Sequence, residues 1–75
     1  MEMTVGAAVK TTVEKKDIDG AKDILIPKGA IGTICELYED WAFIQVWGDE
    51  TSNGIEGVYP YALNEFVLLN DSSNN

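Results

Sequence analysis

The sequence predicts an all-β protein, a five-stranded and mostly antiparallel small barrel with one 3₁₀ turn before its last strand. Short runs rich in β-branched and aromatic residues are separated by turns rich in glycine, proline and acidic residues. The one helix-like stretch, residues 62–65, is too short for more than a single turn. With 75 residues the chain has room for one domain, which we expect at residues 1–69, followed by a disordered polar tail at 70–75.

The amino-terminal part predicts one strand and one long loop. Residues 4–13 are rich in threonine and valine, which favour an extended chain over a helix. Residues 14–28 contain lysines and the polar segment Asp-Ile-Asp-Gly at 17–20, so we expect a long loop there. A short apolar run at Ile24–Ile26 lies within this loop and is stopped by Pro27.

Two further strands are predicted in the middle of the chain. Residues 30–38 form the second strand, and Gly32 within it predicts a bulge or a sharp bend. Glu39 and Asp40 make a tight polar link to residues 41–47, the strongest strand signal in the sequence. The polar residues after this strand, with an Asn-Gly pair near their end, predict a loop.

The carboxy-terminal part predicts the last two strands. Residues 55–59 form the fourth strand, which Pro60 ends. Residues 62–65 form the single turn, and residues 66–69 form the last strand.

The third strand is apolar on both of its faces, which bears on function. Alternate residues of a strand point to opposite sides, so one face carries three large rings and the other carries three smaller residues. Because a core this small has little room, we predict the smaller set inside. The inward set is Ala42, Ile44 and Val46, and the outward set is Trp41, Phe43 and Trp47.

Two interpretations of the outward rings stay open. The loop at 14–28 folds over them as a second small core, or they form an exposed strip for a protein partner or for self-association. Three tyrosines would extend such a strip: Tyr38, Tyr59 and Tyr61.

The charges are unevenly distributed along the chain, whose net charge is -8. Residues 1–28 hold five lysines and five acidic residues and are neutral, whereas residues 29–75 hold eight acidic residues and no cation. At least one acidic face is therefore expected. That face either keeps a small protein in solution or attracts a basic partner.

Missing residue types exclude several kinds of chemistry. Without histidine no Ser-His or Cys-His relay can be built, and a single cysteine allows neither an intrachain disulfide nor a zinc site of cysteines and histidines. We expect Cys35 to be a buried, inert thiol. The calcium-loop-like start at Asp17 fails because Lys22 and Lys28 stand where a glycine and a glutamate are needed. We therefore expect no enzyme, no cofactor and no metal.

The same features guide the choice of partner and location. Five lysines and no arginine within a net negative chain argue against direct binding of nucleic acid or of anionic membranes. No apolar stretch is long enough to cross a bilayer, and no secretory signal is visible. With one cysteine, we expect a cytoplasmic protein. We expect its partner to be another protein, and self-association through an unpaired strand edge is also possible.

The order of these features resembles the SH3-like small β-barrel superfamily, including its KOW-type and uncharacterised bacterial or phage relatives. The matching pieces are the opening strand at 5–10, the long loop at 14–28, Lys-Gly-Ala-Ile-Gly-Thr-Ile at 28–34, Glu-Gly-Val-Tyr-Pro at 56–60 and the turn and strand at 62–67. The resemblance covers about residues 4–69 and implies the fold more than any particular function.

Some peptide-binding positions of SH3 domains are present and others are not. Trp41, after an acidic pair, resembles the groove tryptophan, and Pro60 resembles the groove proline. The paired tyrosines of an opening Ala-Leu-Tyr-Asp-Tyr motif have no counterpart, and Leu63 stands near the position of the other groove tyrosine. This departure argues against recognition of proline-rich peptides.

The sequence therefore predicts a non-catalytic protein-interaction module with an aromatic strip and an acidic rim. An alternative is a small acidic inhibitor of phage or plasmid type that mimics nucleic acid toward a basic protein, and another is a structural accessory subunit. The expected protein-binding residues are Trp41, Phe43, Trp47, Tyr59, Pro60, Glu39, Asp40, Asp49 and Glu50.

Overall fold

The structure, a computed structural model, describes residues 3–16 and 24–69 and is all-β, as predicted. Its elements, in chain order, are β1 (Ala8–Thr11), β2 (Lys15–Lys16), β3 (Leu25–Ile26), β4 (Ile31–Leu37), β5 (Trp41–Trp47), the 3₁₀ turn η2 (Glu50–Ser52), β6 (Glu56–Ala62), the 3₁₀ turn η3 (Leu63–Glu65) and β7 (Phe66–Leu68).

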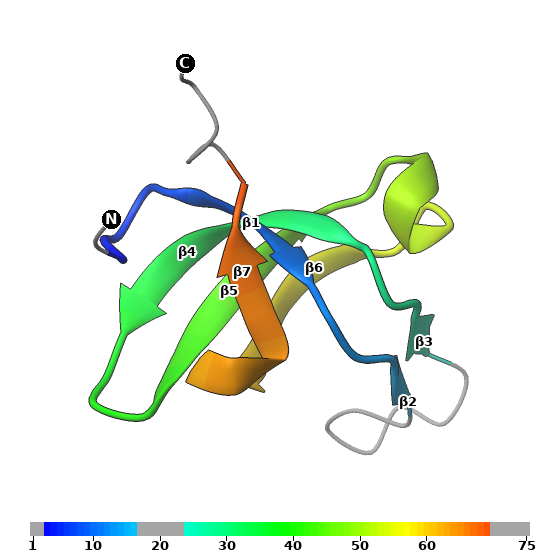
Figure 1. Cartoon of the computed structure of the whole chain (residues 1–75). Coiled ribbons are helices and arrows are strands. Elements are labelled where there is room, and N and C mark those ends of the chain that lie inside the picture. The colour runs from blue at the N-terminus through cyan, green and yellow to red at the C-terminus, as the bar shows by residue number, and fades with distance from the viewer. Residues whose placement is uncertain (1–2, 17–23, 70–75) are drawn as a thin grey trace.

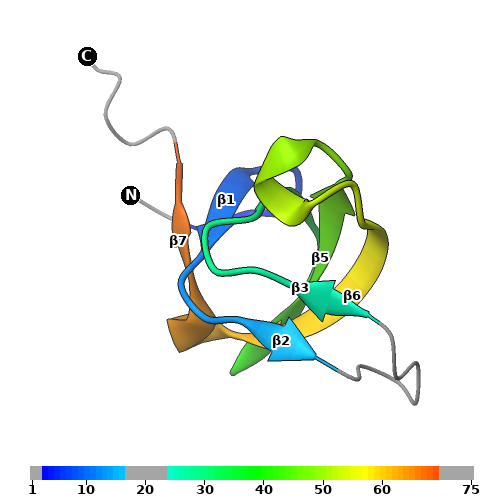
Figure 2. The same ribbon diagram turned by 90° about the vertical axis from the view of Figure 1, so that its right-hand side faces the viewer.

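Five of these strands form one antiparallel sheet in the order β6-β5-β4-β1-β7, and β2 and β3 pair as a separate hairpin. Figures 1 and 2 show that the large sheet is strongly curled, with the hairpin beside one of its ends. Among the described strands no pairing joins the edge strands β6 and β7, so the predicted closed barrel is not found. The strand number also differs from the predicted five, because the loop at 14–28 contributes two short strands of its own.

Other boundaries differ from the predicted ones in smaller ways. The first strand begins only at Ala8, because the chain turns before it and the Gly6 N–H donates to the Ile34 carbonyl (2.8 Å). The polar loop after β5 contains η2, which the sequence did not predict, whereas η3 lies before β7 as predicted. The segment 17–20 and the tail at 70–75 lie outside the described residues.

The interior is divided into two neighbouring apolar clusters. The larger one lies between β1, β4, β5, β6 and β7, and its buried members are Val9, Ile34, Ala42, Ile44, Tyr61 and Phe66. The smaller one joins Ile26 of β3 to Ala30 and Val46, with Ile24, Ile55 and Tyr59 packed around it. Residues 24–26 of the predicted loop therefore do build a second small core. This core packs against the inward side of β5 and not over the outward rings.

The predicted irregularity of β4 is present at a different residue. The β4–β5 register shifts between Ile34 and Glu36, so the bulge lies at Cys35 and not at Gly32. Gly32 has another role, since a Cβ there would lie 2.6 Å from the Gln45 carbonyl oxygen and 2.7 Å from Ile44 Cγ2. Glycine therefore allows β4 and β5 to approach closely, and the bulge turns Glu36 outward while Leu37 packs on the larger core.

Candidate functional site

The two faces of β5 are divided as the sequence predicts. Ala42, Ile44 and Val46 are buried, whereas Trp41 and Phe43 are half-buried and Trp47 is 51% exposed. We call the surface made by the outward side chains of β5 and their neighbours on β4 and β6 the outer face.

The strand register shows which residues join β5 on the outer face. Pro60 of β6 lies opposite Phe43, as expected for a member of the predicted site. Val58, which the sequence analysis missed, lies opposite Gln45 and is 46% exposed. Alternation along residues 56–62 is the signal that could have found Val58, because Pro60 fixes the outward phase.

Three aromatic rings cluster at one end of the outer face. The Tyr38 and Trp41 rings stack with their centroids 4.6 Å apart, and Phe43 meets Trp41 edge-on at 4.8 Å. Tyr38 itself is 43% exposed. Trp41 and Phe43 are thus partly covered by neighbouring rings, which accounts for their half-buried state.

Trp47 lies at the other end of β5 and is held in a fixed orientation. Its indole Nε1 donates a hydrogen bond to the Thr33 hydroxyl on β4 (2.8 Å). Between the two ends, the Cys35 thiol lies 3.8 Å from Gln45 Oε1. The prediction that Cys35 is buried is therefore wrong, because the bulge places this thiol partly exposed on the outer face.

The structure separates two tyrosines from the predicted strip. Tyr59 was a candidate binding residue and Tyr61 a candidate extension, but both lie on the inward phase of β6, opposite Ile44 and Ala42. Tyr59 packs against both apolar clusters, and Tyr61 is only 1% exposed. Strand alternation is the signal that could have placed both tyrosines inward, because Pro60 and Val58 occupy the outward phase of β6.

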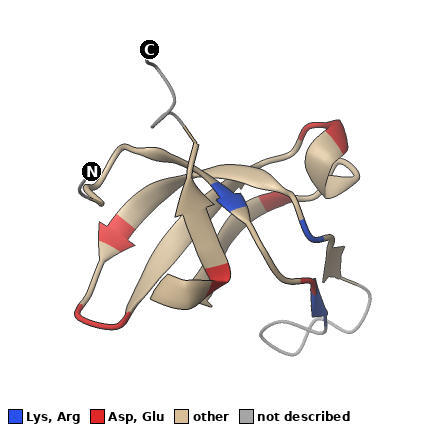
Figure 3. Ribbon diagram, in the orientation of Figure 1, with Lys and Arg blue, Asp and Glu red and all other residues tan. Residues whose placement is uncertain are grey.

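Carboxylates gather at the end of the outer face that carries the ring cluster. Glu39 and Asp40 form the exposed β4–β5 turn, and Glu36 lies outward on β4 beside them (Figure 3). The Tyr38 hydroxyl donates a hydrogen bond to the Glu36 carboxylate. That bond to an anion, together with partial desolvation and the charge of Glu36, raises the pKa of Tyr38.

A second group of carboxylates lies at the Trp47 end, around η2. Asp49 caps this turn, since its Oδ1 accepts from the Thr51 N–H (2.9 Å) and from the Thr51 hydroxyl. Thr51 Oγ1 in turn accepts from the Ile31 N–H (3.0 Å), which ties η2 to β4. Glu50 is exposed on the turn, and Glu56 is exposed opposite Trp47.

The predicted acidic rim is therefore two groups rather than one continuous edge. The ion pairs found among the described residues join Lys15 to Glu65 and Lys16 to Glu14. No described lysine therefore lies within 4.0 Å of a carboxylate in either group. Among residues 3–16 and 24–69, the acidic side chains that pair with no described lysine are Glu36, Glu39 and Asp40 at one end and Asp49, Glu50 and Glu56 at the other.

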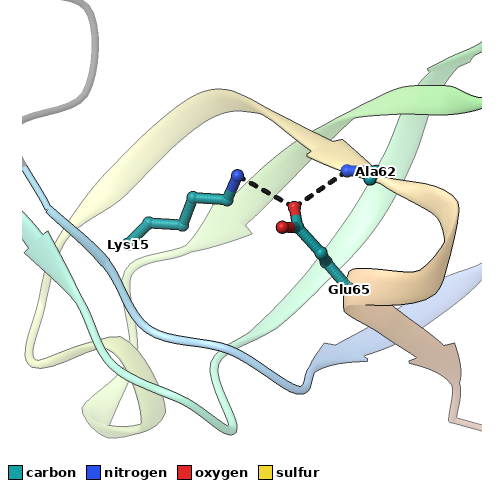
Figure 4. A network of polar contacts seen from close by, with 3 residues as sticks. All are labelled: Lys15, Ala62 and Glu65. Carbon is teal, nitrogen blue, oxygen red and sulfur yellow. Dashed lines mark hydrogen bonds and ion pairs between the residues drawn. The ribbon is translucent and has the colours of Figure 1, made fainter.

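Away from the outer face, a small polar network holds the end of β6 (Figure 4). Glu65 Oε1 lies 2.8 Å from Lys15 Nζ and accepts from the Ala62 N–H at 2.9 Å. These two interactions, with that of Lys15 the larger, lower the pKa of Glu65 despite its partial burial. Lys15 Nζ also lies 5.0 Å from the centroid of the Tyr61 ring.

The described residues contain no helix with the length and apolar character that crossing a bilayer requires. Comparison with protein-family models, with curated proteins and with solved structures finds no match for the chain.

Proposed function

We propose that this chain is a non-catalytic protein-interaction module that binds its partner with the outer face of β4, β5 and β6. The observation that carries the proposal is the group of large apolar side chains on the outer face. Exposed Tyr38, Val58 and Trp47 lie on the same side of the sheet as half-buried Trp41 and Phe43. Large aromatic residues in such a surface are the side chains that most often anchor protein interfaces.

The rings are held in place before any partner arrives. Trp47 is fixed by its hydrogen bond to Thr33, and the Tyr38, Trp41 and Phe43 rings are packed on one another. Because these rings are already ordered, binding a partner would cost little free energy for fixing their side chains. Trp41, Phe43 and Trp47 lie on β5, and Tyr38 directly follows β4, which supports a role as a preformed binding surface.

We also infer that the fold is a small SH3-like one. The curled five-stranded antiparallel sheet, the β2–β3 hairpin and the η3 turn before β7 support this inference. Within such a fold, Trp41 and Pro60 lie on one face, but Leu63 packs on the larger core. The face therefore offers few of the rings that grip a polyproline helix, and we expect a different kind of protein partner.

The test is affinity purification from the source cell with three baits: the wild-type chain, Trp47→Ala and Val67→Ala. Val67 is 50% exposed on β7, outside the outer face, so it is the matched control. We expect a partner that the wild type and Val67→Ala retain equally and that Trp47→Ala retains at least about tenfold less. Equal retention by all three folded baits would show that the outer face is not the binding surface.

The acidic decoy stays a second candidate because the six carboxylates without a described lysine partner border the same face. Purification at low and at high salt separates the two functions. A decoy held by charge loses its partner steeply as salt rises, whereas contacts made by aromatic anchors persist. A partner that high salt removes completely, and that Trp47→Ala does not affect, would favour the decoy.

A further inference from the structure

We infer that the outer face takes a peptide segment with an apolar centre and a cationic side chain at each end. This inference rests on the proposed function, because it names the partner's chemistry for the same surface. Its basis is the arrangement of charge along β5. The seven residues of this strand carry no charge and span about 20 Å at ~3.3 Å per residue. Glu39 and Asp40 precede the strand and Glu36 pairs opposite Phe43, whereas Asp49 and Glu50 follow the strand and Glu56 pairs opposite Trp47.

The two acidic ends pair with no lysine in the part of the chain that the structure describes, so their carboxylates can attract a partner's cations. At the ring cluster, Glu36 is bonded to Tyr38, and Glu39 and Asp40 lie in the turn between Tyr38 and Trp41. No described lysine lies within 4.0 Å of these three carboxylates. The same holds at the other end for Asp49, Glu50 and Glu56. Apolar contact in the middle supplies affinity, while opposite charges at the ends fix the position and speed the encounter.

The ring-cluster end favours arginine over lysine. Tyr38 stacks on Trp41 with one side and is 43% exposed, and its hydroxyl is bonded to the Glu36 carboxylate. A planar guanidinium can lie on an exposed aromatic ring and at the same time pair with a neighbouring carboxylate. Lysine makes the charge contact without the stacking.

A second copy of the chain is a poor occupant of this face. Two copies that met face to face around a two-fold axis would bring carboxylates against carboxylates, whichever way the strands ran. Like charges brought together in an interface oppose association. Charge complementarity therefore favours a foreign, cationic segment.

The contact is made over the face and not by adding a strand to the edge of β6. The Ala62 N–H donates to Glu65 and not to β5. The backbone nitrogens at positions 60 and 58 share its orientation and therefore also point away from β5. Pro60 has no N–H to offer at the first of these positions. An added strand would find few donors there, which leaves side-chain contact with the outer face.

The test uses designed peptides that lack tryptophan, so that Trp41 and Trp47, the chain's two tryptophans, report binding by fluorescence. One 14-residue helical peptide carries two arginines at each end and leucines between them. Its control has the same composition with all four arginines in the centre. A seven-residue extended pair with the same two arrangements is measured alongside.

We expect an end-charged peptide to bind at least about tenfold more tightly than its control. The double variants Glu39→Gln/Asp40→Asn and Glu50→Gln/Glu56→Gln should each weaken that binding by about fivefold, as expected for one or two partly exposed ion pairs. Glu14→Gln, on the chain segment before β2, is the matched control and should change it by less than about twofold. Replacing the arginines of the end-charged peptide with lysines should also weaken binding, because lysine cannot stack on Tyr38 at the ring-cluster end.

Several outcomes would overturn the inference. It is wrong if neither end-charged peptide binds, if both arrangements bind equally, or if neither double variant has an effect. It is also wrong if sedimentation shows a dimer that Trp47→Ala dissociates, because a second copy would then occupy the face. The proposed function survives each of these results as long as Trp47→Ala still loses the cellular partner, so the two failures are distinguishable.

Discussion

At the scale of single residues, Tyr61 shows how function and stability are separated in this chain. Its ring fills the larger core, and its hydroxyl is buried with no hydrogen-bond partner among the described residues. Burial first, and then the nearby charges of Glu65 and Tyr59, raise the pKa of Tyr61 to about 12. A buried hydroxyl without a partner loses its hydration and gains nothing in return.

We predict that Tyr61→Phe raises the free energy of unfolding by about 1 kcal/mol at neutral pH, because it removes that unpartnered hydroxyl. In the wild type, unfolded tyrosine ionises near pH 10, so the stability contributed by neutral Tyr61 is lost as the pH rises from about 10 toward 12. The phenylalanine variant should lack this alkaline loss. Urea unfolding at pH 7 and at pH 11 measures both effects.

Tyr38→Phe is the control at pH 7, since it changes an exposed tyrosine and should alter the free energy of unfolding by less than about 0.5 kcal/mol. A Tyr61→Phe protein less stable than the wild type at pH 7 would mean that the hydroxyl has a partner in solution.

At the scale of elements, the sequence predicts β5 and its two faces well because that strand has clear contrast in side-chain size. It predicts β6 less well, because tyrosines and Pro60 on neighbouring positions make both phases look apolar. The bulge at Cys35 could not be placed from the sequence, since Gly32 carries the usual glycine signal and is instead used for close strand approach. The β2–β3 hairpin was missed because two-residue strands leave too short a pattern to detect.

The polar network of Lys15, Glu65 and Ala62, which links β2, η3 and β6, predicts how the stability of the fold changes at acidic pH. Glu65 has a lowered pKa, so its contribution to stability is complete above its ordinary value and is lost as the pH falls through the lowered value. Glu65→Gln keeps an oxygen for the Ala62 N–H but loses the ion pair with Lys15. We expect a loss of roughly 0.5–1 kcal/mol in the free energy of unfolding at pH 7, and this loss should shrink as the pH falls from 7 toward 3.

Urea unfolding across this pH range measures the effect, with Glu14→Gln as the matched control. The Glu14 pair with Lys16 is longer, at 3.8 Å, and more exposed, so its removal should matter little at any pH. If the deficit of Glu65→Gln stayed constant down to pH 3, the ion pair would not be its cause.

At the scale of the whole molecule, charge and apolar surface are arranged around one curled sheet. The cores fill the inside of the curl. The carboxylates that pair with no described lysine lie toward the two ends of β5, and the ion-paired lysines lie on β2 (Figure 3). The net charge of the sequence predicts an acidic surface but not where it lies. Only the register of the strands places Glu36 and Glu56 toward opposite ends of β5.

We predict that added salt stabilises the folded chain, because it screens repulsion within a protein of net charge -8. Raising sodium chloride from about 20 to about 500 mM should raise Tm by several degrees, which corresponds to about 1 kcal/mol for a domain of this size. The Glu39→Gln/Asp40→Asn variant should show a smaller rise by scanning calorimetry. A Tm that falls with salt would mean that attractive pairs such as Lys15–Glu65 outweigh the repulsion.

The bulge in β4 has a practical consequence through the sulfur atom it displays. Cys35 is the chain's single cysteine, and it lies partly exposed between the ring cluster and Trp47. A photoreactive group attached to this thiol would lie on the outer face, and the chain has no second thiol to label. Irradiation inside a cell extract would then join the chain covalently to whatever molecule docks there, including a weakly bound one that washing removes.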